Sequence, residues 1–385
     1  MTSFNVLRNF TSIALTACCA IGISSARAQT YTLTDLGVLR DQKSGGSTPA
    51  AINDQARVAG TSGSSAFRYT KESKTPMEDV GKNPDGSSRG FGIDASGQVV
   101  GDSTFGKGEI SRAAIFSNGS ASGLGTLPNG GPFSRANGIN ALGQVVGSSS
   151  QTLDGNQSRA FFVSTPHQPA IMTDLGTLGG AYAQALGIND SGFVTGNSQT
   201  GDAAESTHAF IWSQRTGMQD LGTLDGGFSY GTSINAKNHV VGYSTINNVD
   251  DRVHAFLHKG DQMIDLGSLA GASSGLDYSY ALGVNLHDQV VGYSYLSSDQ
   301  GKGLTNTPLG PWSVAFIYSQ GLMTNLNDLI GDATENYRLD SATGINNAGQ
   351  IVAVAFNISA NAFHAVLLTP NSNVGPARSV GSARR

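Results

Sequence analysis

The sequence is poor in the residues that make covalent or thiolate-metal cross-links. Its only cysteines, Cys18 and Cys19, lie near the N-terminus, in a stretch that the sequence predicts to be removed. A mature chain that begins at Gln29 then has no thiol, which excludes disulfides and thiolate metal sites.

Charged residues and long apolar runs are also scarce. Only 13% of the residues are charged, and removal of Arg8 and Arg27 with residues 1–28 leaves 21 basic and 28 acidic side chains, a formal charge of −7. This acidic balance argues against nucleic acid as a partner. No stretch beyond residue 28 approaches the roughly 20 apolar residues of a membrane span, so we expect no transmembrane segment.

Residues 1–28 have the pattern of an export signal. Arg8 is followed by an apolar run from Ile13 to Ile23 and by Ala26-Arg27-Ala28, a small-x-small cleavage site. A lipoprotein signal is the alternative, because Leu15-Thr16-Ala17-Cys18 has the pattern that precedes a lipid-modified cysteine. We therefore expect a secreted, extracellular or periplasmic protein, or one that is lipid-anchored through Cys18.

Glycine, in contrast, is abundant, and much of it belongs to a repeated unit. An Ile-Asn step or a near equivalent recurs seven times, at intervals of 41 to 61 residues. The copies begin at Ile52, Ile93, Ile139, Ile188, Ile234, Val284 and Ile345. Repeats of this length are typical of propellers and solenoids.

Each copy contains four strand-like segments, seen best at 185–188, 193–198, 208–212 and 218–224. Gly, Asn or Asp stands four residues after the first residue of the step in six copies, where a hairpin turn needs a residue that tolerates positive φ. Ala56 is the exception, in the first copy.

The two ends of the repeat region complement each other. The seventh copy lacks a fourth strand, and residues 31–39 supply a matching segment at the other end of the chain. An N-terminal strand that completes the last repeat is how a propeller ring is closed. We predict an all-β, seven-bladed propeller of four-stranded blades over residues 29–370, with a β-solenoid as the alternative and a disordered tail at 371–385.

Three motifs recur in the same order and carry a family resemblance. They are the Gly-Ile-Asn steps, the His-Ala-Phe strands at His208 and His254, and the Asp-Leu-Gly-Thr-Leu segments at Asp174 and Asp220. Over roughly residues 30–370 the chain resembles the bacterial extracellular HAF (His-Ala-Phe) repeat family. The resemblance implies an exported repeat protein and supplies no catalytic residues.

Apparent catalytic signals fit the repeat better than they fit an active site. Ser88, Ser229 and Ser273 match the Gly-x-Ser-x-Gly pattern of esterases, but each match leads into a strand where that mechanism needs a helix. Ser88 and Ser229 also share a slot with Ser47, Ser134 and Ser279, which indicates a structural hydroxyl.

The repeated histidines are also expected to be structural. His208, His254 and His364 occupy one repeat position, so they should lie in separate blades and hydrogen-bond a neighbouring strand or the recurring Asp of the fourth strand. Acidic loops at 154–156, 202–205 and 247–251 match no known calcium-loop spacing and are expected to be solvated. We predict no cofactor and no metal site.

Aromatic residues in the connections between repeats are the best candidates for ligand binding. These connections lie on one side of a propeller, together with the loops between second and third strands. The candidates are Phe133, Tyr182, Phe228, Tyr230, Tyr278, Tyr280 and, in the long loop 295–312, Trp312. Such a rim can stack on sugars or anchor a protein. The alternative is that the rings fill the space between blades.

We therefore predict a monomeric extracellular binding module that is not an enzyme, with a polysaccharide or a cell-surface protein as its ligand. A glycan hydrolase or lyase is one alternative, and it would need carboxylates such as Asp277, Glu335 or Asp340 to converge at the mouth of the channel. A passive envelope or matrix component is another.

Overall fold

The computed structural model describes residues 29–372, except for 41–44, 82–85, 106–109, 118, 156, 165–169, 203, 205, 248–251, 272–275 and 297–312. The predicted signal at 1–28, residues 373–385 of the predicted tail and Trp312 lie outside the described residues.

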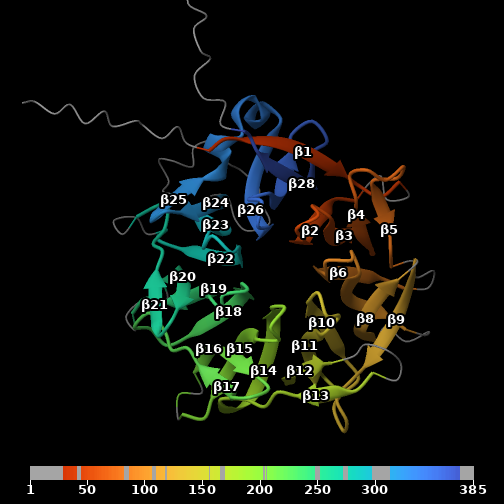
Figure 1. The fold of residues 1–385 in the computed structure, drawn as a ribbon, viewed down its shortest axis with the longest axis vertical. Helices are drawn as coiled ribbons and strands as arrows, with labels where there is room; N and C mark the ends of the chain where they lie inside the picture. The colour runs from red at the N-terminus through yellow and green to blue at the C-terminus, as the bar shows by residue number, and fades with distance from the viewer. Residues whose placement is uncertain are drawn as a thin grey trace, which may run out of the picture.

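The strands form seven antiparallel four-stranded sheets that stand around a common axis as the blades of a propeller (Figure 1). Blades 1 to 6 follow one another along the chain, as β2–β5, β6–β9, β10–β13, β14–β17, β18–β21 and β22–β25. Blade 7 contains β26, β27, β28 and β1. The prediction of a seven-bladed propeller is confirmed.

Each blade repeats the same order of strands from the axis outward. The innermost strands are β2 (Ser47–Ile52), β6 (Ser88–Ile93), β10 (Ser134–Ile139), β14 (Gly179–Ile188), β18 (Ser229–Ile234), β22 (Ser279–Val284) and β26 (Tyr337–Ile345). The second strands are β3 (Val58–Ser62), β7 (Val99–Thr104), β11 (Val145–Ser150), β15 (Val194–Thr200), β19 (Val240–Thr245), β23 (Val290–Tyr295) and β27 (Ile351–Asn357).

The third strands are β4 (Ser65–Tyr69), β8 (Ser111–Ser117), β12 (Ser158–Val163), β16 (Thr207–Ser213), β20 (Val253–Lys259), β24 (Ser313–Ser319) and β28 (Ala362–Pro370). The outermost strands are β1 (Tyr31–Gly37), β5 (Met77–Asp79), β9 (Ser120–Gly125), β13 (Met172–Asp174), β17 (Gly217–Asp220), β21 (Gln262–Asp265) and β25 (Leu322–Asn325). Two short 3-10 helices, η1 (Leu326–Leu329) and η2 (Gly331–Glu335), connect blades 6 and 7.

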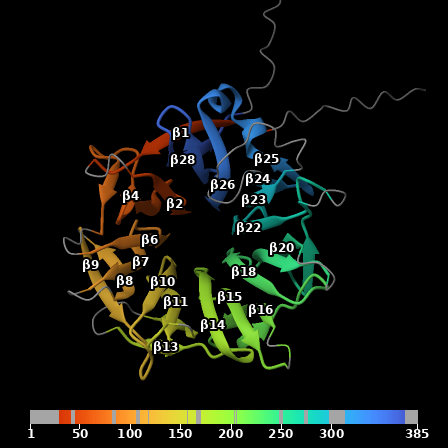
Figure 2. The ribbon, with the colours of Figure 1, turned by 180° about the vertical axis from the view of Figure 1, so that it is seen from behind.

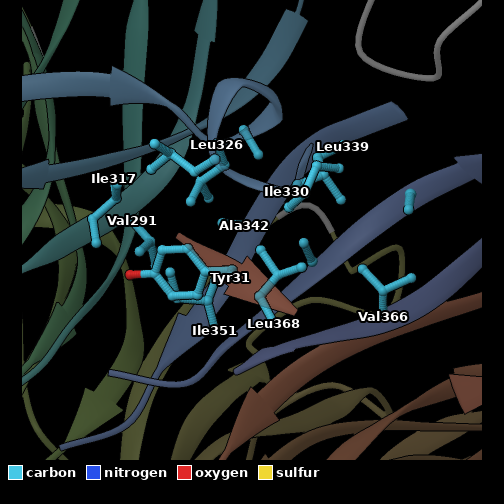
Figure 3. Close-up of a cluster of buried hydrophobic side chains, with 14 of the residues drawn as sticks. Tyr31, Val291, Ile317, Leu326, Ile330, Leu339, Ala342, Ile351, Val366 and Leu368 are labelled. Atoms are coloured by element: carbon cyan, nitrogen blue, oxygen red, sulfur yellow. The ribbon is translucent and has the colours of Figure 1, made fainter. Parts of the chain in front are cut away.

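The ring is closed by the N-terminal strand, as the sequence predicts. β1 pairs with β28 from Tyr31 opposite Pro370 to Gly37 opposite Ala365, and the two strands lie side by side in both views of the ring (Figures 1 and 2). Figure 3 shows Tyr31 among Leu326, Leu339 and Leu368 in the core of this last blade. The described structure continues beyond Pro370, and the Asn371 backbone N–H donates to the Thr30 carbonyl at 2.9 Å.

The recurring Phe of the third strand forms the centre of most blades. Five of these rings, Phe67, Phe161, Phe210, Phe256 and Phe316, are fully buried. In three blades the ring lies against the glycine of the second strand, at Gly60, Gly147 and Gly242, where an added Cβ would come within about 3 Å of the ring. The Phe of the third strand and the glycine of the second strand are therefore the two sides of one packing contact.

The hairpin between first and second strands is the same in all seven blades. Its fourth position has positive φ at Ala56, Gly97, Gly143, Gly192, Asn238, Asp288 and Gly349. Ala56 therefore departs from the pattern in residue type only, and its backbone adopts the same left-handed conformation, with φ of 57°.

The fourth strand is shorter than the predicted 218–224, because the chain turns immediately after Asp220. Gly222 has φ of 73° and its N–H donates to the Asp220 carboxylate at 2.8 Å. The same Asp-to-Gly contact recurs at Asp35, Asp79, Asp174 and Asp265. β5, β13, β17 and β21 therefore end at this Asp, whereas β1 continues to Gly37 with a shift of register after Asp35.

Candidate ligand-binding face

The two sides of the ring differ in chemistry. The turn face carries the hairpins between first and second strands. The loop face carries the longer connections between second and third strands and between successive blades. On the turn face the same residue types recur in nearly every blade, whereas the side chains of the loop face vary from blade to blade.

On the turn face, the recurring Asn joins each blade to the next. Its Oδ1 accepts backbone N–H groups of its own hairpin, as Asn189 does from Ser191 and Phe193. Its Nδ2 donates to the carbonyl of the equivalent residue in the next blade, as Asn189 does to Asn235 at 2.9 Å. The other donors are Asn53, Asn140, Asn235, Asn285 and Asn346. The Gly-Ile-Asn motif is therefore a structural link.

The recurring serine of the first strand is a structural hydroxyl, as predicted. Ser229 accepts from the Ala209 N–H at 2.8 Å and donates to the Gly222 carbonyl at 2.5 Å, which ties blade 5 to blade 4. The equivalent serines, Ser47, Ser88, Ser134 and Ser279, make the same pair of contacts. Each of these hydroxyls therefore both donates and accepts a hydrogen bond within the fold. Ser273 lies outside the described residues.

The repeated histidines bind the Asp that ends the fourth strand, as predicted. His208 Nδ1 lies 2.8 Å from the Asp220 carboxylate, and His254 Nδ1 lies 2.8 Å from that of Asp265. In blade 7 the partner of His364 is Asp35, from the closing strand β1, at 2.7 Å. Of the described residues, no group of three or more His, Cys, Asp or Glu side chains is placed to hold a metal ion.

The carboxylates considered for glycan cleavage sit in separate environments. Asp277 is buried and accepts from His254 Nε2 at 3.0 Å and from the Ser268 hydroxyl at 2.5 Å. Asp340 is buried and accepts from Arg338 Nε at 3.0 Å, and burial raises the pKa of this carboxyl to about 6 against the effect of Arg338. Glu335 is exposed on η2.

On the loop face, blades 5 and 6 carry a continuous cluster of seven aromatic rings, which we name the aromatic cluster. Tyr230 stacks on Tyr243 with centroids 5.1 Å apart, and Tyr280 stacks on Tyr293 at 4.7 Å. The edge of Tyr280 meets Tyr243 across the boundary between the blades at 4.9 Å. Phe228, Tyr278 and Tyr295 complete the cluster.

All seven rings of the aromatic cluster are partly exposed, so each is both packed and accessible. Burial, and secondarily the neighbouring phenols, raise the pKa of Tyr243 and of Tyr280 to about 12. Their hydroxyls therefore stay protonated at neutral pH and can both donate and accept hydrogen bonds.

Four of the aromatic residues predicted from the sequence, Phe228, Tyr230, Tyr278 and Tyr280, belong to the aromatic cluster. Two others, Phe133 and Tyr182, line a cavity of about 360 Å³ over blades 2 to 4. The contact between Tyr243 and Tyr280 also shows that part of the cluster fills space between blades, which was the alternative interpretation.

The same cavity contains a charged group that the sequence analysis missed. The buried Asp102 carboxylate accepts from Arg89 through Nε at 2.9 Å and Nη2 at 2.5 Å, and from Arg135 through Nε at 3.2 Å. Both guanidinium groups lie over the ring of Phe91, at 5.6 and 5.0 Å from its centroid.

Strand register explains how these side chains come to share one rim. In each of five successive blades, one residue of the first strand pairs with the residue that directly follows the glycine of the second strand. These pairs are Arg89 with Asp102, Arg135 with Ser148, Gln184 with Asn197, Tyr230 with Tyr243, and Tyr280 with Tyr293. Alignment of the repeats at these two positions would have found the missed residues.

A second cavity lies below this rim. Its wall includes Phe91, Leu186 and Leu282, and then the Gly-Ile steps of the innermost strands. A Cβ added at Gly283 would lie 3.1 Å from the Gly344 Cα in the next blade, so the inner strands approach backbone to backbone at this level. A ligand that enters from the loop face therefore meets the rim first.

None of the helices in the described part of the chain has the length and apolar character that a membrane-spanning helix requires.

Comparisons with known proteins agree with the fold. The model of a family described as "Protein of unknown function (DUF3466)" matches residues 179–365, which run from the start of β14 into β28. No curated protein sequence matches the chain.

Among solved structures, the chain is similar to YCF48 bound to D1 peptide, at 10% identity and a TM-score of 0.50, over 90% of this chain and 97% of that one. It is also similar to TolB from Acinetobacter baumannii, at 9% identity and a TM-score of 0.39, over 89% of this chain and 63% of that one. A gluconolactonase from Xanthomonas campestris gives 9% identity and a TM-score of 0.39, over 89% and 91% of the two chains. At such identities the likeness to YCF48 establishes the propeller fold alone.

Proposed function

We propose that this protein is an exported binding module that recognises a glycan on the loop face of its propeller. The observation that carries the proposal is the aromatic cluster of blades 5 and 6, with seven rings in mutual contact and all partly exposed. The export signal expected at 1–28 and the resemblance to the HAF repeat family support an extracellular setting.

The chemistry of the cluster suits a sugar. Tyrosine offers an apolar face on which a pyranose ring can stack and a hydroxyl that exchanges hydrogen bonds with sugar hydroxyls. The cluster is tyrosine-rich, with Phe228 as its one ring without a hydroxyl. Tyrosine is also common at protein-binding surfaces, so a protein partner is the alternative that the test must separate from a glycan.

The cluster is also held rigidly. Tyr230, Tyr243, Tyr280 and Tyr293 belong to paired strands rather than to loops, and each stacks on its cross-strand neighbour. Such rings lose little conformational freedom when a ligand arrives, which favours affinity.

The test is a glycan array and a polysaccharide pull-down with the purified chain that begins at Gln29. Phe228→Ala and Tyr278→Ala remove rings at the margin of the cluster, where folding is least at risk, and each variant is checked by thermal unfolding. Tyr318→Ala, in β24 and away from the aromatic cluster, is the matched control. We expect specific capture that weakens in the two cluster variants and persists in the control.

If the wild-type protein captures no glycan, the proposal fails and a protein partner becomes the leading candidate. If a captured polymer is also shortened on incubation, the enzyme alternative gains support instead.

A further inference from the structure

The cavity beside the aromatic cluster differs from it in charge. Among the described residues that line it, the charged ones are Arg89, Arg135 and Asp102. Two guanidinium groups face one carboxylate, so the cavity carries a local charge of about +1 in a chain whose formal net charge is −5. Of the five register pairs of the rim, those of blades 4 to 6 are uncharged, so the positive charge lies over blades 2 and 3.

The two arginines are engaged to different degrees. Arg89 donates hydrogen bonds to Asp102 from both Nε and Nη2. Arg135 donates to the same carboxylate from Nε alone, at 3.2 Å. In the described part of the chain, neither terminal nitrogen of Arg135 has a hydrogen-bond partner, and 43% of its side chain is exposed. The guanidinium fork of Arg135 is therefore available to a carboxylate from outside.

Arg135 is also held in place. Its guanidinium group lies over the face of Phe91, and the buried Asp102 fixes its Nε edge. A cation fixed in this way loses less rotational freedom on binding than a solvated arginine would.

A buried amide supports the neighbouring ring of the same rim. Asn197 is 1% exposed, and its side chain is hydrogen-bonded to the Tyr182 hydroxyl. Asn197 pairs in register with Gln184, and both Gln184 and Tyr182 line the cavity. The Tyr182 ring therefore lies beside the two arginines, where a sugar next to a bound carboxylate could stack on it.

We infer that the cavity over blades 2 to 4 is an anion subsite and that the ligand is an acidic glycan whose uronate carboxylate binds the guanidinium fork of Arg135. This inference rests on the proposed function, because the sugar rings next to the carboxylate would stack on Tyr182 and on the aromatic cluster. Donors on one side of the rim and phenol rings on the other match a polymer that carries both carboxylates and pyranose faces.

The test compares uronate oligosaccharides with the same molecules after their carboxylates have been reduced to alcohols. Oligogalacturonate, oligoalginate and oligoglucuronate are titrated by calorimetry against the wild-type protein, Arg135→Gln and Arg68→Gln. Arg135→Gln leaves the Arg89 pair with Asp102 in place. Arg68→Gln, a control on blade 1, removes an arginine paired with Glu78 outside the cavity.

We expect the wild-type protein to bind at least one uronate series roughly tenfold or more tightly than its reduced form, as a charge-assisted hydrogen-bond pair would give. Arg135→Gln should lose this preference and keep its affinity for the reduced form. Arg68→Gln should behave like the wild-type protein.

Equal binding of both forms, or an Arg135→Gln variant with an unchanged preference, would overturn the anion subsite while leaving glycan binding intact. Absence of binding to every acidic and neutral glycan would overturn both proposals. Binding of poly-glutamate as tight as that of the uronates, and insensitive to Tyr278→Ala, would also overturn the inference, because it would show non-specific attraction of anions.

Discussion

The Nδ2 of Asn346 donates to the backbone carbonyl of Asn53 at 3.1 Å, although the two residues are 293 positions apart. This bond closes a chain of six Asn-to-carbonyl contacts around the turn face. One junction of the seven is different. Blade 2 carries Asp94, which can accept but cannot donate when ionised, so the link from blade 2 to blade 3 lacks this bond.

Asp94→Asn should therefore stabilise the protein. The new amide would donate to the Asn140 carbonyl, while its Oδ1 would keep the contacts that Asp94 makes with Ser96 and Gln98. We expect a gain of about 1 kcal/mol in the free energy of unfolding, measured by denaturant titration. The reverse change, Asn140→Asp, removes one donor at the next junction and should destabilise; a shift of both variants in the same direction would contradict the explanation.

Ala56→Gly should also stabilise. Ala56 holds φ of 57°, where glycine, Asn or Asp stands in the other six hairpins. Relief of the left-handed strain is partly offset by the greater freedom of glycine in the unfolded chain, so the expected gain is about 0.5–1 kcal/mol. Thermal unfolding measures it, with Ala95→Gly in the next hairpin as a control that should not stabilise.

Ser229→Ala tests whether the Gly-x-Ser-x-Gly match is structural. Loss of the hydroxyl leaves the buried Ala209 N–H and the Gly222 carbonyl without their shared partner, at a cost of about 1–3 kcal/mol in unfolding free energy. Ser279→Ala should cost a similar amount because it makes the same contacts. Covalent labelling of wild-type Ser229 by a fluorophosphonate would refute the structural role.

The contacts of His254 predict a pH dependence of stability. Burial alone lowers the pKa of this imidazole, but hydrogen bonds and charges from Asp265 and Asp277 outweigh that effect and raise the pKa. Because the folded-state pKa exceeds the unfolded value of about 6.5, the stabilisation is complete below about pH 6.5 and is lost as pH rises through the folded pKa.

We therefore compare wild-type protein and His254→Gln by denaturant titration between pH 5 and pH 9. The variant should lose on the order of 2 kcal/mol at the acidic end, because the buried Asp277 loses the charged imidazolium and keeps only Arg252 as a charged partner, and the difference should shrink towards pH 9. A difference between the two proteins that does not change with pH would show that His254 is not charged in the fold.

The repeat made the fold predictable from the sequence. The spacing of the Ile-Asn steps, the missing fourth strand after Leu368 and the matching segment at 31–39 together determine the number of blades and the closure of the ring. Repeat register also identified Ser229 and His254 as structural, because several residues at one repeat position cannot converge on a single active site.

The rim was harder to predict, because it is built from positions that vary between copies. Tyr230 and Tyr280 were found by their aromatic character, but their stacking partners Tyr243 and Tyr293 follow the glycine of the second strand and are read as ordinary strand residues. Register within blade 2 pairs Arg89 with Asp102, but the contact of Arg135 with Asp102 depends on the distance between neighbouring blades, which strand patterns do not specify.

Closure by β1 also bears on how the chain reaches its folded state. Tyr31 emerges from the ribosome about 340 residues before its strand partner Pro370, so the first strand to be made is among the last to be paired. Until then the outer edge of β28 has no neighbour, and blades 1 to 6 and the other three strands of blade 7 must already be in place for the gap to have the right width. Contacts of such long sequence separation slow folding and prolong the exposure of unpaired edges. A chain released before blade 7 is complete would therefore hold six finished blades and an open ring with an unpaired strand edge, which can pair with another copy.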